Sequence, residues 1–192
     1  MSQVQTIHAK LLKIVDAIQN ADTKQKVTAM IEDPRLMNLL MSCPASIQES
    51  TGGAYVGGLL DYAILTTSYL KKMASPELGL NIPVDDIILA GLFHHLGKIG
   101  WPAQSVYTEL DSDWHKKKGI HYEMNRGYYG YNFNTISLWY LGEYGIKVSP
   151  EAFEAISAMS NKPADEFNYN SLTILLLAAS RLAWKKLTAE TK

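Results

Sequence analysis

The sequence predicts an all-α protein, a compact bundle of helices, and three observations lead to this expectation. In segment after segment, apolar residues recur at steps of three and four, which is the period of an amphipathic helix. Proline, glycine and short polar clusters separate these segments, and we see no convincing strand and no internal repeat. The 192 residues, 47% hydrophobic and 19% charged, suit one globular domain with its own core. We therefore expect a single helical domain over residues 1–192.

The N-terminal part predicts three helices. The first carries its apolar face on Ile7, Leu11, Ile14, Val15 and Ile18, and a weaker helical pattern follows over residues 23–31. Pro34 suits the first turn of a third helix, where an N–H has no intrahelical partner, and Asp33 precedes it as a cap. Residues 48–53 are polar and end on glycines, so we expect a loop there.

Two helices are predicted in the middle of the chain. The first covers residues 57–73 and has lysines in its last turn, where cations suit the helix dipole. The second begins at Pro83, with acidic residues near its N-terminus, and lasts about three turns. It delivers His94 and His95 at its C-terminus, and Gly91 within it indicates close contact with another helix.

The C-terminal half begins with the least regular stretch, residues 101–134, in which aromatic and basic residues are interleaved. We expect a functional connection or lid there, with room for one short helix. Asn134 is expected to cap the helix that follows. Ser149, followed by proline and glutamate, predicts the start of another helix, and a final helix is predicted over residues 172–183.

Charge and cysteine content exclude several classes of protein. The net charge of −1 and the isoelectric point near 6.5 leave no global basic field, so there is no strong nucleic-acid signal. Cys43 is the sole cysteine, which excludes an internal disulfide and a cysteine-based zinc site and fits a reducing cytoplasm. Neither a signal peptide nor a membrane span is evident. We expect a cytoplasmic protein with no membrane partner.

Residues 90–100 read AGLFHHLGKIG and place two adjacent imidazoles at the end of an apolar helix, with Gly-Lys just beyond. This segment resembles the signature of the HD-domain metal-dependent phosphohydrolases, in which a helix ends in His-Asp before a Leu-Gly-Lys turn. Residues 44–46 and 52–62 resemble a segment of the HD-type 3′ to 5′ exoribonuclease group, and residues 133–139, 154–156 and 177–183 follow further family blocks in order. The resemblance implies an HD-like core at 44–187, preceded by N-terminal helices at 1–43.

The departures from the family pattern fall on its metal ligands. The positions that the family fills with ligand histidines and aspartates hold Tyr62, His95, Phe133, Met159, Ser160 and Ser180, and only His94 matches. Tyrosine, phenylalanine, methionine and serine supply neither a neutral imidazole nor a charge at pH 7, whereas divalent ions need several such donors. We therefore expect no metal, no other cofactor and no catalytic residues, because the Lewis acid and the acidified water would be missing.

The resemblance implies that a set of side chains gathers in the former active-site cleft and binds a ligand there: Asp61, Tyr62, His94, His95, Lys98, Ser160, Ser180 and Arg181. Tyr62 would plug the metal position. Lys98 and Arg181 are the cations nearest to the motifs, and each could bind a phosphate without a metal, so replacing either with alanine should weaken binding by about tenfold. The leading hypothesis is a catalytically degenerate HD-domain protein that binds, and so sequesters, a nucleotide-like or other phosphorylated small molecule.

Two other classes of function stay open. An active phosphohydrolase on nucleotides or nucleic acid would have to rebuild its metal ligands from His94, His95, Asp61, His121 or Glu123. An interaction module with a filled cleft would instead bind a protein partner or a second copy of the chain. The aromatic and basic residues of 101–131 suit base stacking and a protein interface equally.

Overall fold

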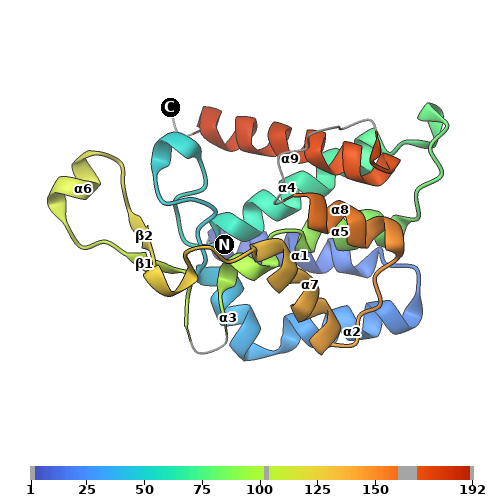
Figure 1. Ribbon diagram of the computed structural model, residues 1–192, viewed down its shortest axis with the longest axis horizontal. Coiled ribbons are helices and arrows are strands. Elements are labelled where there is room, and N and C mark those ends of the chain that lie inside the picture. Colours follow the sequence, from blue (N-terminus) through green and yellow to red (C-terminus); the bar gives the residue numbers. More distant parts are fainter. Residues whose placement is uncertain (1–2, 102–103, 160–167, 191–192) are drawn as a thin grey trace.

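A computed structural model describes residues 3–101, 104–159 and 168–190, and in these ranges the protein is an all-α bundle, as the sequence predicts (Figure 1). The α-helices are α1 (Gln3–Asp16), α2 (Ala21–Glu32), α3 (Pro34–Ser42), α4 (Gly58–Met73), α5 (Val84–Phe93), α6 (Asp113–Lys117), α7 (Phe133–Glu143), α8 (Pro150–Ala158) and α9 (Ser171–Glu190). Single 3-10 turns add η1 (Glu49–Thr51), η2 (Pro76–Leu78), η3 (Leu96–Ile99) and η4 (Arg126–Tyr128). Among the described residues, no helix combines the length and apolarity needed to cross a bilayer.

The helix starts follow local capping chemistry. Asp33 Oδ1 accepts from the Arg35 N–H at the start of α3, and Ser149 Oγ accepts from the Ala152 N–H at the start of α8, which confirms both predicted caps. The prediction for α7 is wrong, because Asn132 is its cap and accepts from the N–H groups of residues 134 and 135. Asn134 instead lies inside α7 with its side chain buried.

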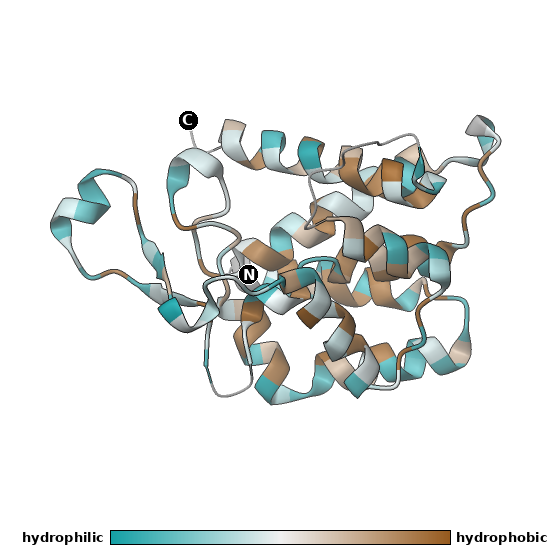
Figure 2. Cartoon of the chain, in the orientation of Figure 1, coloured by the Kyte–Doolittle hydropathy of each residue, from teal (hydrophilic) through white to brown (hydrophobic). Residues whose placement is uncertain are grey.

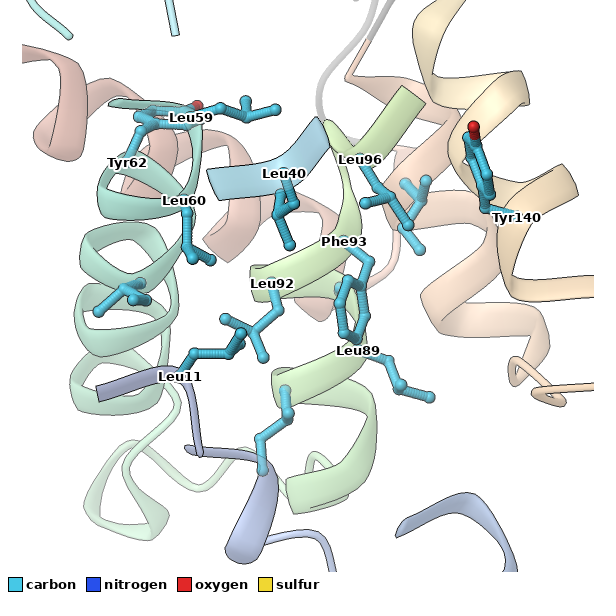
Figure 3. Packing of buried hydrophobic residues seen from close by; sticks show 14 of the residues in the cluster. Leu11, Leu40, Leu59, Leu60, Tyr62, Leu89, Leu92, Phe93, Leu96 and Tyr140 are labelled. Carbon is cyan, nitrogen blue, oxygen red and sulfur yellow. The ribbon is translucent and has the colours of Figure 1, made fainter. Parts of the chain in front are cut away.

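The core is centred on α5. Every residue of this helix from Asp86 to Phe93 is buried, because α4, α8 and α9 surround it. Figure 2 shows hydrophobic residues concentrated on α5 and hydrophilic residues on α6. Figure 3 shows Leu92 of α5 among Leu11 of α1, Leu40 of α3 and Leu60 of α4. A helix that is apolar all round is typical of the centre of a bundle.

Gly91 lets α5 approach α4 closely, as its place in the sequence predicts. A Cβ atom added to Gly91 would lie 2.6 Å from Thr67 Oγ1 and 2.9 Å from Thr67 Cα. These distances are shorter than van der Waals contact, so a side chain does not fit at this crossing. The position of α5, and therefore of the two histidines at its end, depends on this glycine.

The prediction that the chain contains no strand is wrong. Tyr107–Glu109 (β1) and Tyr122–Met124 (β2) form a small antiparallel sheet in the register Tyr107 opposite Met124. The hairpin carries α6 at its tip and projects from the bundle (Figure 1). Strands of three residues are too short for an alternating pattern to appear in the sequence, and they are stabilised by their pairing.

The stretch between α6 and β2 is hydrogen-bonded to the segment before α4. Glu49 N–H donates to the Gly119 carbonyl at 2.8 Å, His121 N–H donates to the Ile47 carbonyl at 3.0 Å, and His121 Nε2 lies 2.7 Å from Glu49 Oε1. Thr188 Oγ1 of α9 donates to the Thr51 carbonyl at 3.3 Å. The hairpin, the segment around residue 49 and the C-terminal end of α9 therefore meet in one place.

Candidate functional site

His94 is a fully buried histidine at the C-terminal cap of α5. Its Nδ1 lies 3.1 Å from the Ala90 carbonyl oxygen and 2.9 Å from the Gly91 carbonyl oxygen. Because carbonyl oxygens only accept, Nδ1 carries the proton and Nε2 of the neutral ring is an acceptor. Burial lowers the pKa of His94 from 6.5 to about 4. The ring is therefore neutral at pH 7, with its Nε2 lone pair directed at α4.

Tyr62 of α4 meets that lone pair. Its hydroxyl oxygen lies 3.3 Å from His94 Nε2 and 2.6 Å from Ser180 Oγ of α9. Since Nε2 must accept, the consistent arrangement has Tyr62 donating to His94 and Ser180 donating to Tyr62. Burial raises the pKa of Tyr62 to about 12, so the phenol keeps its proton. Side chains of α4, α5 and α9 converge on this hydroxyl.

His95 completes what we call the Tyr62 cluster, formed by Tyr62, His94, His95 and Ser180. The His95 ring is stacked on Tyr62 with centroids 5.8 Å apart, and its centroid is 4.5 Å from that of His94. Its Nδ1 lies 3.3 Å from the amide nitrogen of Asn134. Burial, with a smaller contribution from the neighbouring His94 and Lys98, holds the pKa of His95 well below its usual value.

The start of α7 holds the turn that follows the histidines. The Asn134 side chain donates to the His94 carbonyl, and Ser137 Oγ accepts from the Gly97 N–H at 2.8 Å. Gly97 has no space for a side chain, because an added Cβ would overlap the Phe133 carbonyl of α7. Sequence reasoning aligned residues 133–139 with a family block but did not assign these roles. Asn134 and Ser137 stand within a largely apolar helix, which is the signal that could have indicated buried, bonded side chains.

A pocket of about 720 Å³ opens beside the Tyr62 cluster. Its walls come from the segment before α4, the hairpin, η3 and the C-terminal part of α9, through Ala45, Ser46, Ile47, Gln48, Ser50, Thr51, Lys98, Tyr107, Met124, Trp184 and Thr188. Trp184 joins the pocket to the cluster, because its ring also packs against Tyr62 with centroids 4.5 Å apart. A volume of this size suits a small molecule of drug or nucleotide size.

Lys98 supplies the charge of this pocket. Its Nζ donates to the Ala45 carbonyl at 3.2 Å and lies 5.5 Å from the centroid of the Trp184 ring. The ion pairs found among the described residues do not include Lys98. Burial of the side chain lowers the pKa of Lys98 below its usual value. The ammonium group is thus partly desolvated, with a carbonyl dipole and an aromatic face as its neighbours.

Not all of the predicted site residues come together. The structure gathers Tyr62, His94, His95 and Ser180 in the cluster and places Lys98 on the adjoining pocket. Asp61 is directed elsewhere, because its Oδ2 accepts from the Tyr55 hydroxyl at 2.7 Å. Arg181 is exposed on α9, and Ser160 lies outside the described residues. Neighbours on a helix point about 100° apart, which explains why residues 61 and 181 leave a cluster that residues 62 and 180 form.

Trp184 is the residue of this site that sequence reasoning missed. It follows Ser180 by four positions on α9, so the two side chains share one face of that helix. This spacing could have identified it once Ser180 was a candidate. The polar wall residues of 48–51 are predicted only as a loop, and their spacing gives no signal that they line a pocket.

The Tyr62 cluster does not suit the divalent ion that the resemblance implies. Its donors are one neutral imidazole with its lone pair already bound to Tyr62, a phenol, a hydroxyl and a second histidine stacked on the phenol. No carboxylate belongs to it, and hard cations prefer carboxylate oxygens. Across residues 3–101, 104–159 and 168–190, no group of three or more His, Cys, Asp or Glu side chains is arranged to hold a metal.

No family model matches this chain, and no curated protein or solved structure is significantly similar to it. The resemblance to HD-domain phosphohydrolases therefore stays a prediction based on the order of the sequence blocks. The contacts of the Tyr62 cluster and of the pocket are observed in the structure and do not depend on that resemblance.

Proposed function

We propose that this protein binds a nucleotide-like or other phosphorylated small molecule in the pocket beside the Tyr62 cluster, as a catalytically degenerate HD-domain protein. The observation that carries the proposal is the Lys98 ammonium group on the pocket wall, outside the ion pairs of the described residues. A cation held away from water without a counter-charge destabilises a fold. A bound phosphate would remove that cost and gain a charge-assisted hydrogen bond.

The remaining walls suit the other parts of such a ligand. Ser50 places a hydroxyl group on one side, and a hydroxyl can donate to a phosphate oxygen. The Ser46 and Thr51 hydroxyls beside it donate to the Gly52 and Gln48 carbonyls. Tyr107 and Trp184 bring aromatic rings, against which a base can pack. An apolar pocket with a few polar groups and one cation is the usual form of a small-molecule site.

Binding without hydrolysis follows from the donor set of the cluster. The family's reaction uses a metal ion to acidify a water molecule and to polarise the phosphate. Here the Nε2 lone pair of His94 is taken by the Tyr62 hydroxyl, and Ser180 offers an uncharged oxygen. These side chains position one another rather than a divalent ion.

Purified protein is expected to contain no stoichiometric transition metal and to show no metal-stimulated phosphatase activity. The reason is the loss of carboxylate and imidazole donors at the positions that the family uses. Elemental analysis, and hydrolysis of p-nitrophenyl phosphate with added Mg²⁺, Mn²⁺ and Co²⁺, measure the two quantities. About one metal per chain, together with activity that His94→Ala abolishes, would contradict the proposal and favour the rebuilt phosphohydrolase.

Replacing Lys98 with methionine is expected to weaken the binding of a nucleoside monophosphate by about tenfold or more, because one charge-assisted hydrogen bond to phosphate is lost. Methionine keeps the apolar stem, so the pocket wall stays intact. Calorimetry with the four ribonucleoside 5′-monophosphates measures the change, and circular dichroism checks the fold.

Lys71→Met is the matched control, since Lys71 is exposed in the last turn of α4. The sequence predicts the same loss for Arg181→Ala, but its exposed position leads us to expect a smaller one, because solvent screens its charge. Equal affinity of the wild type and Lys98→Met for every monophosphate would remove phosphate binding as the function and leave the interaction module.

A further inference from the structure

The charges that line the pocket are few. Among its described lining residues, Lys98 is the one with a formal charge at pH 7, and the others are hydroxyl, amide, aromatic or apolar. Glu49 stands between the lining residues Gln48 and Ser50, with its carboxylate 2.7 Å from His121 Nε2. The pocket therefore offers one positive charge, and a negative charge belongs to the segment that forms its rim.

We propose that this pocket selects a phosphate group that carries a single negative charge, as a phosphodiester does, attached to a flat aromatic body. The inference rests on the proposed function and specifies its ligand class. One ammonium group neutralises one charge. A second or third charge on the ligand would find no further cation on the described walls, so it would stay unpaired, and this weakens binding relative to a singly charged phosphate. The hydroxyl and amide groups on the described walls carry no charge and do not neutralise it.

The aromatic part of the ligand is inferred from the walls that face Lys98. Ile47, Tyr107, Met124 and Trp184 make most of the pocket apolar. The Trp184 indole already has Lys98 Nζ above its ring and Tyr62 against it, so its orientation is set from two directions. A ligand whose phosphate reaches Lys98 would thus lay its remaining surface on these side chains, which favours a flat apolar body over a second polar group.

The titratable groups around Lys98 allow a test in which pH acts on the ligand. His94 and His95 have lowered pKa values, and Cys43 and Tyr107 have raised ones, so these four stay uncharged between mildly acidic and neutral pH. Glu49 and His121 at the rim are the other groups to consider. Both ligands are measured at each pH, so that each comparison is made on the same protonation state of the protein.

The experiment compares the tightest-binding nucleoside 5′-monophosphate with its own methyl phosphodiester, by calorimetry in the presence of EDTA. The two probes differ by one methyl group, and a phosphomonoester loses its second proton at a pKa of roughly 6. At about pH 7.5 the diester, with one charge, is expected to bind about tenfold tighter than the dianionic monoester. At about pH 5, where the monoester also carries roughly one charge, the two affinities should agree within about threefold.

The nucleoside triphosphate should bind more weakly than either probe at neutral pH, and Lys98→Met should abolish the preference for the diester. A monoester that binds as tightly as the diester at neutral pH would overturn the charge selection and leave the proposed function in place. So would a gap that persists at acidic pH, because shape and not charge would then explain it. Absence of binding by every probe would overturn the proposed function itself.

Discussion

Replacing Gly91 with alanine is expected to destabilise the protein by about 3 kcal/mol, the upper end of the range for overpacked cores. The new Cβ would lie 2.6 Å from Thr67 Oγ1 and 2.9 Å from Thr67 Cα. The second of these atoms is backbone, so a change of side-chain rotamer cannot relieve the overlap and the helices α4 and α5 must separate. Urea denaturation followed by circular dichroism measures the free energy of unfolding.

Gly142→Ala is the matched control. Gly142 is an exposed glycine in α7, and no heavy atom comes within 4 Å of a Cβ added there. Because alanine has the higher helix propensity, this substitution should stabilise the protein by about 0.5–1 kcal/mol. The same chemical change is thus expected to have opposite signs at two helical glycines. A Gly91→Ala variant as stable as the wild type would show that the crossing of α4 and α5 is looser than described.

Lowering the pH from about 7 to about 4 is expected to cost about 3 kcal/mol of stability through His94 alone. Burial lowers its pKa in the folded protein to about 4, whereas the unfolded chain keeps the usual 6.5. At neutral pH both states are uncharged at this residue and no difference arises. As the pH falls below 6.5, His94 becomes protonated in the unfolded state but stays neutral in the folded state. The free energy of unfolding therefore declines until the pH reaches the pKa of His94 in the folded protein. His95, with its lowered pKa, adds to the decline.

Denaturation curves at a series of pH values measure this loss. A His94→Gln variant should show a shallower dependence on pH, and His8→Gln on α1, outside the cluster, is the matched control. The histidine proton resonances of the folded wild type give a second measurement, which does not depend on the stability of a variant. A His94 resonance that titrates near 6.5 would contradict the buried, neutral state.

The helices could be predicted from the sequence because local rules determine them. Capping by Asp33 and Ser149 depends on neighbours within three residues, and the apolar periodicity extends along each helix. The prediction that Tyr62, His94, His95 and Ser180 share one place came from the family resemblance, and their contacts are present in the structure.

The rest depends on partners that are distant in the sequence. The hairpin strands have no periodic signal of their own, and the His121 contact to Glu49 joins residues 72 positions apart. Asn132 and Asn134 are equally good caps by residue type, and the His94 carbonyl, which binds the second of them, decides between the two. The pocket brings together four separate segments, so its size and its single cation appear only once the chain has folded.

The Tyr62 hydroxyl is held between His94 of α5 and Ser180 of α9. The joint between α4, α5 and α9 therefore consists of side chains of the protein itself. These contacts join side chains of three helices that are far apart in the sequence, so the joint forms in the same step as the packing of those helices.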